Sequence, residues 1–185
     1  MYPFGGVKGS APGKGDSMRI AGLVSDSIVD GPGIRLTVFA QGCPHHCPGC
    51  HNPNSHDPMG GSEVTVADIL QKIEKNPLLD GITLSGGEPF AQAEDCAKIA
   101  AAAHQRGLNV WTYTGYIYEH LQAGEETHPG WKALLDETDV LVDGPFIQKE
   151  RSLELKFCGS RNQRLIDMQK TRAAGQILLW QPPVW

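Results

Sequence analysis

Residues 34–50, IRLTVFAQGCPHHCPGC, hold the two features from which the fold and the chemistry can be predicted. The first part, residues 34–41, is rich in apolar and β-branched side chains and predicts a strand. Cys43, Cys47 and Cys50 follow that strand, and the prolines and the glycine between them exclude a helix. Because active sites of parallel α/β folds lie at the carboxyl ends of strands, we expect this cysteine loop to form the functional site.

The number of thiols in the loop limits what it can bind. Three thiols presented by one loop suit a soft metal or an iron–sulfur cluster. Structural zinc sites and all-cysteine cubane clusters take four ligands, so three cysteines leave one position open for a small molecule. An alternative is a Cys3His zinc site, with His45, His46 or His51 as the fourth ligand.

The composition is that of an ordinary globular protein. The chain has 185 residues, about one domain, with 40% hydrophobic and 20% charged residues. Its net charge of −5 argues against a nucleic-acid partner, and no apolar run approaches the length of a membrane span or forms a signal peptide. Five cysteines, three of them clustered, fit a metal site in the reducing cytoplasm better than disulfides. We expect Cys96 to be a small core residue, and Cys158 is a weak candidate for a fourth zinc ligand.

The order of predicted elements indicates the fold class. Residues 1–17, rich in Gly, Ser, Pro and Lys, predict a flexible tail, and residues 18–185 a single domain. Strands are predicted at 19–25, 34–41, 81–85, 108–113 and 139–142, and helices at 66–75, 92–106, 116–121 and 131–137. This alternation is typical of parallel βα units and is too short for an eightfold barrel. We therefore predict an α/β fold, a partial (open) βα barrel with about five or six parallel strands.

Several predicted strands end in a polar or glycine-rich cluster. These clusters are Gly86-Gly87-Glu88, Thr112-Tyr113-Thr114-Gly115 and Asp143-Gly144. Glycines let a backbone approach a ligand closely, Glu88 can take an ammonium group, and Asp143 can hold a cation or a hydroxyl. Each cluster alone is as well explained by a turn or by solvated surface. Beside three cysteines on converging strand ends, they predict one ligand site.

These motifs resemble those of a known family. The pattern Cys43-x3-Cys47-x2-Cys50, with Gly86-Gly87-Glu88 at a later strand end, resembles the radical S-adenosylmethionine enzymes. Residues 30–35 (DGPGIR) and 50–53 (CHNP) are similar to the glycyl-radical-enzyme activating enzymes. Residues 140–146 (VLVDGPF) and 159–167 (GSRNQRLID), with the short length, are similar to the branch that activates anaerobic ribonucleoside-triphosphate reductase. The resemblance covers residues 18–180.

The resemblance implies a cofactor set and its ligands. Cys43, Cys47 and Cys50 would hold three irons of a 4Fe–4S cluster, and the amino and carboxylate groups of S-adenosylmethionine would chelate the fourth iron. Gly86, Gly87 and Glu88 match the motif that holds the methionine amino group.

It also implies residues around that cofactor. Asp143 and Thr112 match positions lining the same pocket, where a monovalent cation can sit, and Asp30 falls in the loop that approaches the partner's glycine. The chain departs from the family at Gly49, where pyruvate formate-lyase activases carry an aromatic residue, and at Thr112, where they carry an aspartate. Cofactor contacts are then expected from His51 and Asn52.

The implied function is that of an oxidoreductase, a radical S-adenosylmethionine activase. It would cleave S-adenosylmethionine to methionine and a 5′-deoxyadenosyl radical, and so generate a glycyl radical on the catalytic subunit of anaerobic ribonucleoside-triphosphate reductase. A small electron donor such as flavodoxin or ferredoxin is expected. The alternatives are an activase of another glycyl-radical enzyme such as pyruvate formate-lyase, a Cys3His zinc-binding adaptor, and a protein that only transfers electrons. Arg161 and Arg164 are assigned no role.

Overall fold

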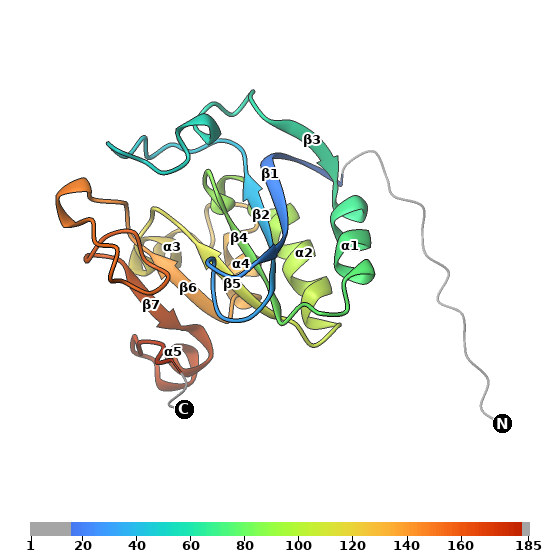
Figure 1. Ribbon diagram of the computed structural model, residues 1–185. Helices are drawn as coiled ribbons and strands as arrows, with labels where there is room; N and C mark the ends of the chain where they lie inside the picture. Colours follow the sequence, from blue (N-terminus) through green and yellow to red (C-terminus); the bar gives the residue numbers. More distant parts are fainter. Residues whose placement is uncertain (1–15, 183–185) are drawn as a thin grey trace.

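A seven-stranded mixed sheet forms the centre of the computed structural model, which describes residues 16–182 (Figure 1). The strand order is β3-β1-β2-β4-β5-β6-β7. The strands are β1 (Ser17–Ser27), β2 (Arg35–Ala40), β3 (Ser62–Thr65), β4 (Gly81–Gly86), β5 (Asn109–Tyr113), β6 (Val140–Asp143) and β7 (Arg164–Asp167). The helices are α1 (Val66–Lys75), α2 (Ala93–His104), α3 (Tyr118–Gly124), α4 (Trp131–Asp136) and α5 (Met168–Ala174), and the 3₁₀ turns are η1 (Pro53–Ser55), η2 (Pro89–Gln92) and η3 (Gln148–Glu150).

The sheet confirms the α/β class but contains fewer parallel strands than predicted. Of the described strands, β2, β4, β5 and β6 are mutually parallel, whereas β1, β3 and β7 pair antiparallel with their neighbours. The predicted number of parallel strands, five or six, is therefore too high. The physical reason lies in the connections, because parallel neighbours need a crossover. The short loop of residues 28–34 joins β1 to β2 without one, and so does the loop of residues 144–163 between β6 and β7, which contains only the 3₁₀ turn η3.

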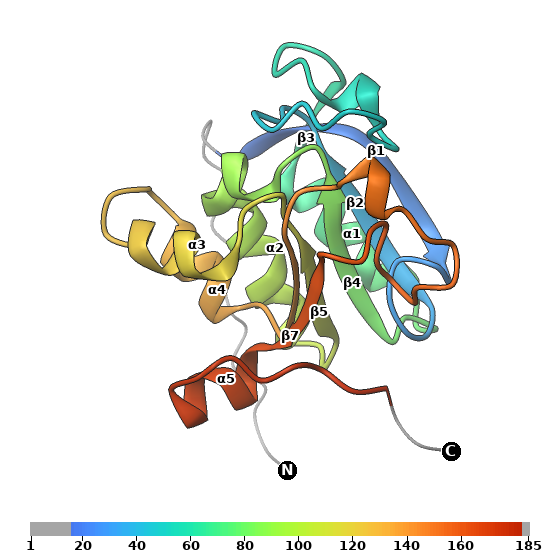
Figure 2. The ribbon, with the colours of Figure 1, turned by 90° about the vertical axis from the view of Figure 1, so that its left-hand side faces the viewer.

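Two hydrophobic layers cover the faces of the sheet. Ile82, Leu84 and Val110 point to the larger core, which the helices α1 to α4 complete. Trp111, Val140 and Val142 point to the opposite face, where they contact residues that include Phe157 and Trp180. The alternation along each strand separates the two layers. Figure 2 shows the helices on one side of the sheet and the loop of residues 144–163 on the other.

The predicted helices form close to their expected bounds. Thr65 caps α1 in a capping box with Asp68, and Ile69 and Ile73 are buried one turn apart. The Ala-rich α2 packs closely on the sheet because its buried side chains are small, and Gly107 follows it with a φ of 73°.

The strands β3 and β7 and the helix α5 lie outside the predicted elements. The edge strand β3 has mostly exposed residues and no apolar alternation, and α5 spans only seven residues. Most of the predicted flexible tail, residues 1–15, lies outside the described residues. Ser17, which the prediction assigned to that tail, begins β1 instead. Over the described residues, no helix is both long enough and apolar enough to cross a membrane.

Candidate functional site

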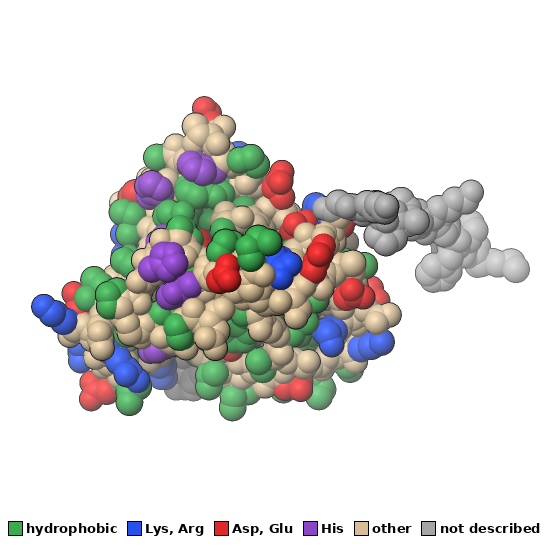
Figure 3. Space-filling model, turned by 90° about the horizontal axis from the view of Figure 1, so that it is seen from above, with side chains coloured by type: hydrophobic (Ala, Val, Ile, Leu, Met, Phe, Trp, Pro, Cys, Tyr) green, Lys and Arg blue, Asp and Glu red, His purple; other side chains and the backbone are tan. Residues whose placement is uncertain are grey.

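A cavity of about 510 Å³ opens at the carboxyl ends of β2, β4 and β5. It brings together eight of the residues predicted to form the site: Asp30, Cys43, Cys47, Cys50, His51, Asn52, Gly86 and Gly87. Other lining residues include Tyr113, Thr114, Gly115, Phe146, Gly159 and Gln163. Seen from above, histidine side chains gather on the face that carries the cysteine loop (Figure 3). The predicted convergence of strand ends therefore holds for Cys43, Gly86-Gly87, residues 113–115 and Gly144, which all line this cavity.

Backbone hydrogen bonds join the start of the cysteine loop to residues 55 and 56, which follow it. Gly42 N donates to Ser55 O at 2.8 Å, and Cys43 N donates to His56 O at 3.1 Å. Gly42, His46 and Gly49 have positive φ values of 92°, 45° and 73°, which turn the chain so tightly that its three cysteines face one cavity. All three thiols are half-buried.

The Cys43 thiol lies near the Glu88 carboxylate. Burial raises the pKa of the Cys43 thiol, and the nearby Glu88 carboxylate raises it further. Ligand binding at this sulfur must therefore release a proton at neutral pH. Among residues 16–182, no three Cys, His, Asp or Glu side chains lie close enough together to hold a single metal ion. The three thiols share a cavity rather than one coordination point.

The end of β4 passes directly beneath the cysteine loop. Gly87 N donates to Ala40 O at 2.7 Å, and Glu88 N donates to Gly42 O at 2.8 Å. A Cβ at Gly87 would lie 2.5 Å from Gly42 O, so no other residue fits there without moving the backbone. The glycines are thus needed for the close approach of two chain segments, and they leave backbone groups at the cavity wall.

The side chain of Glu88 does not line the cavity. It is completely buried, and its Oε2 accepts hydrogen bonds from Thr114 Oγ1 at 3.0 Å and Gly115 N at 2.9 Å. Its Oε1 accepts from Phe90 N at 3.0 Å, and His45 Nε2 lies 2.8 Å from Oε2. The carboxylate that we expected to take an ammonium group is engaged by four groups of the protein.

Thr112 and Asp143 also point away from the cavity. Thr112 is completely buried, and its hydroxyl lies 2.9 Å from that of Thr138. Asp143 is 1% exposed and is bound by Arg164 and by Tyr118 N. The structure therefore places a guanidinium, rather than a pocket, beside the carboxylate that we expected to hold a cation. Arg161 is exposed and lies 3.8 Å from Glu154.

Asp30 lies at the cavity wall and is held by a buried network. Its Oδ2 accepts from Ser27 Oγ at 2.5 Å and from Thr37 Oγ1 at 3.1 Å. The loop that carries it is anchored by Arg35, whose guanidinium donates to Pro32 O at 3.0 Å and to Thr83 Oγ1 at 2.7 Å. Burial lowers the pKa of Arg35 to about 10, so it remains a cation at neutral pH. The conformation of this loop thus depends on one buried charge.

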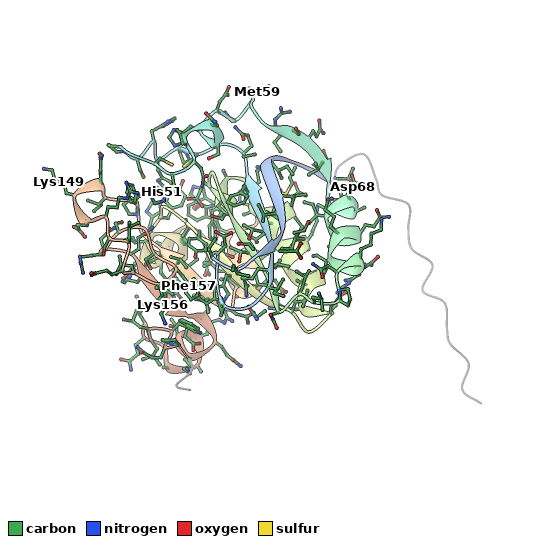
Figure 4. The ribbon with its side chains drawn as sticks, in the orientation of Figure 1. His51, Met59, Asp68, Lys149, Lys156 and Phe157 are labelled. Atoms are coloured by element: carbon green, nitrogen blue, oxygen red, sulfur yellow. The ribbon has the colours of Figure 1, made fainter. Side chains whose placement is uncertain are left out.

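Sequence reasoning missed the residues on the far side of the cavity. Phe146 packs against His51 with ring centroids 4.8 Å apart, and Gly159 leaves room for the same imidazole. Figure 4 shows His51 beside the loop of residues 144–163. Gln163 fixes that loop by accepting from Gly159 N at 2.8 Å and donating to Gly144 O at 3.0 Å. These residues lie in the stretches 140–146 and 159–167, and the resemblance of those stretches to the family was the only sign in the sequence that they belong to the site.

Comparison with known proteins supplies the family. Residues 29–166 match the family model described as "4Fe-4S single cluster domain". The chain is 37% identical, over 74% of its length and 90% of the relative's, to the anaerobic ribonucleoside-triphosphate reductase-activating protein of Escherichia coli K12. It is 33% identical to the protein of that name from Vibrio cholerae, over 74% of this chain and 89% of the relative.

Two further similarities are more distant. The pyruvate formate-lyase 1-activating enzyme of Escherichia coli K12 is 32% identical over 88% of this chain and 65% of its own length. Among solved structures, QueE from Escherichia coli matches with a TM-score of 0.42 and 15% identity, over 54% of this chain and 52% of that one. The family model and the reductase-activating relatives each cover well over half of the chain. The chain therefore belongs to the glycyl-radical-enzyme activating family of radical S-adenosylmethionine enzymes.

Proposed function

We propose that this protein is the activase that generates a glycyl radical on anaerobic ribonucleoside-triphosphate reductase. The observation that carries the proposal is that Cys43, Cys47 and Cys50 line the same cavity as Gly86 and Gly87. Three thiols beside a stretch of backbone that only glycine permits suit a cluster with one iron open to a small ligand. The similarity to two reductase-activating proteins over 74% of the chain supports the choice of partner.

The donor set fits a 4Fe–4S cluster and S-adenosylmethionine. When bound and reduced, the cluster would supply the one electron needed for cleavage of the C–S bond of S-adenosylmethionine to methionine and a 5′-deoxyadenosyl radical, and this radical would take a hydrogen atom from the partner's glycine. In this proposal Cys43, Cys47 and Cys50 hold three irons. The backbone at Gly86 and Gly87 receives the methionine amino group. No side chain needs to act as a general acid or base.

The wall formed by His51 and Asn52 is assigned to the adenosyl part of the ligand. Both residues line the cavity, and the ring of His51 packs against Phe146. Gly49 offers no ring to stack on, so an adenine must find its contacts on these neighbours. Asp30, held by Ser27 and Thr37 at the same cavity, is assigned to the approach of the partner's glycine.

Several finer assignments belong to the same proposal. Residues 18–185 act as one radical S-adenosylmethionine domain, its sheet curved as a partial barrel. A small one-electron carrier such as flavodoxin or ferredoxin reduces the cluster. The free thiols suit a reducing, cytoplasmic location. A monovalent cation near Asp143 would have to compete with Arg164, whose guanidinium already binds that carboxylate.

A second candidate partner is pyruvate formate-lyase. It is favoured by the similarity to a pyruvate formate-lyase activase over 88% of the chain. That relative is longer than this chain, which covers 65% of it. The two candidates share every step at the cavity and differ only in the protein that enters it.

The partner is tested by presenting both candidates to the same preparation. The full chain, reconstituted with iron and sulfide under anaerobic conditions and reduced, is mixed with S-adenosylmethionine and either purified enzyme. The glycyl radical is then measured by electron paramagnetic resonance. We expect the radical on the reductase. A radical on pyruvate formate-lyase alone would show that this enzyme, and not the reductase, is the partner. No radical on either enzyme would contradict both assignments.

A further inference from the structure

His45 links the cysteine loop to the end of β4. It lies between Cys43 and Cys47 in the sequence, and its Nε2 is 2.8 Å from Glu88 Oε2. The side chain of His45 is 16% exposed and that of Glu88 is completely buried. Polar contacts at the cavity thus join the middle of the loop to a carboxylate at the base of the site.

The carboxylate of Glu88 is itself fixed from three other directions. The carboxylate accepts hydrogen bonds from Phe90 N, Thr114 Oγ1 and Gly115 N. The backbone N–H of Glu88 donates to Gly42 O at 2.8 Å. A side chain held by this many groups has little freedom to turn toward a ligand. It is therefore a rigid acceptor for His45.

The surroundings of the imidazole are shaped to it. Tyr116 meets the ring edge-on at a centroid distance of 4.4 Å. A Cβ at Gly115 would lie 2.3 Å from His45 Cδ2, so the absence of a side chain there makes the space that the ring occupies. By contrast the neighbouring His46 is exposed and has one ring contact, with His56 at 4.9 Å.

We propose that His45 is a positioning residue for the cluster, and that the His45–Glu88 hydrogen bond holds the loop between the first two cysteines in its ligand-ready shape. The inference rests on the proposed function, because it concerns how the same three thiols receive the cluster. It also assigns Glu88 to holding the loop. The methionine amino group of S-adenosylmethionine is then left to the backbone at Gly86 and Gly87.

The expected size of the effect follows from metal sites in general. Groups that orient metal ligands without touching the metal change metal affinity by about 10- to 100-fold when they are removed. Here the hydrogen bond is to a charged and buried acceptor, which is among the stronger kinds. Losing it would free the segment between Cys43 and Cys47 while leaving all three thiols in place.

The test compares the same substitution at two neighbouring positions. His45→Asn is too short to reach Glu88, and His46→Asn is its matched control, since asparagine tolerates the positive φ of 45° at that position. His45→Gln can reach the carboxylate through its amide N–H and serves as the rescue. The full chain is reconstituted anaerobically, and the rate of iron loss to a chelator is followed by absorbance, with apo-protein melting as a check on folding.

We expect His45→Asn to lose iron roughly tenfold faster than wild type or His46→Asn, with His45→Gln in between and similar apo melting for all four. Equal iron loss from His45→Asn and His46→Asn would overturn the proposal. Faster loss that His45→Gln does not slow would also overturn it, because the hydrogen bond would then not be the cause.

The second measurement uses Glu88→Gln, which keeps the shape of the side chain and removes its charge. We expect faster iron loss that is not additive with His45→Asn in the double variant, and unchanged affinity of the loaded protein for S-adenosylmethionine. Weaker S-adenosylmethionine binding with normal iron retention would instead give Glu88 the role of an ammonium ligand and overturn the assignment. Failure of the proposed function is distinguishable, because it would appear in wild type itself, as a protein that holds no cluster or that forms no glycyl radical on the reductase, whereas this inference fails on the comparison of iron loss between the variants.

Discussion

Arg164 binds the buried carboxylate of Asp143, with Arg164 Nε 3.0 Å from Oδ1 and a second contact from its terminal nitrogen to Oδ2. The same guanidinium also donates to Glu119, at 3.0 and 2.8 Å. The pair joins the end of β6 to the beginning of β7. Arg164, which the sequence left without a role, is thus the charge partner of a residue expected in the cofactor pocket.

Arg164→Met should destabilise the fold and leave the cofactor site intact. Because Asp143 is 1% exposed, removing its cation leaves a buried charge. We expect a loss of about 2 to 4 kcal/mol in the free energy of unfolding, measured by urea denaturation, since Arg164 itself is partly exposed. The exposed Lys149→Met in the adjoining loop is the control, with a change of no more than about 0.5 kcal/mol. Unaltered stability of Arg164→Met together with weaker S-adenosylmethionine binding would instead show that Asp143 belongs to the cofactor pocket.

Single alanine substitutions should separate the three ligand cysteines from the other two. Cys43→Ala, Cys47→Ala and Cys50→Ala should each abolish retention of a 4Fe–4S cluster, measured as iron and sulfide per chain. Cys96→Ala should retain it, because burial raises the pKa of Cys96 far above neutrality and keeps it a core thiol on α2. Cys158→Ala should also retain it, since burial raises the pKa of that thiol to about 11 and it does not line the cavity. A cluster that survives Cys47→Ala but not Cys96→Ala would refute the ligand assignment.

Gly87→Ala should disrupt the junction between β4 and the cysteine loop. The new Cβ would lie 2.5 Å from Gly42 O and 2.9 Å from Ser55 O, both backbone atoms that cannot move independently. We expect a destabilisation of about 1 to 3 kcal/mol and loss of cluster binding. Gly22→Ala in β1 is the matched control, because nothing lies within 4 Å of its Cβ position. If Gly87→Ala melts and loads with iron like Gly22→Ala, the close approach is not essential.

The stability of the fold should depend on pH through His104. Burial alone lowers the pKa of His104, but hydrogen bonds to Asp139 and Glu137 outweigh it and raise that pKa above its ordinary value of 6.5. A raised pKa in the folded state stabilises the protein fully below the unfolded pKa, and this contribution is lost as the pH rises through the folded pKa.

His104→Gln removes the titrating group and gives the test. Urea midpoints of both proteins should be compared between about pH 6 and pH 9, a range that spans the ordinary pKa of histidine. We expect the advantage of wild type over His104→Gln to shrink as the pH rises. A constant difference across the range would show that His104 does not titrate in this window.

The sequence was informative wherever a local pattern determined the structure. Helix α1 could be predicted from its apolar spacing and from Thr65, and the cysteine loop could be placed after β2 because Pro and Gly exclude regular structure there. The edge strand β3 could not, because it pairs with β1 through backbone bonds that exposed residues do not reveal. The direction of β7 depends on how the loop of residues 144–163 returns to the sheet, which no local pattern specifies.

Within the site, residue types were more predictable than the directions of their side chains. The cysteines and glycines line the cavity as expected, since their positions follow from the ends of β2 and β4. Glu88 turns away from the cavity because it binds His45, which lies 43 positions earlier in the chain. Asp143 turns away because it binds Arg164, which lies 21 positions later. Such long-range partners appear only when the chain is folded.

The function proposed for the three cysteines is to hold a cluster that cleaves S-adenosylmethionine. The most direct test is the electron paramagnetic resonance spectrum of the reconstituted, reduced full chain before and after S-adenosylmethionine is added, with 5′-deoxyadenosine measured in the same sample. We expect a cubane signal that changes shape when S-adenosylmethionine binds, and 5′-deoxyadenosine as a product. A colourless protein that holds one zinc ion and forms no 5′-deoxyadenosine would contradict it.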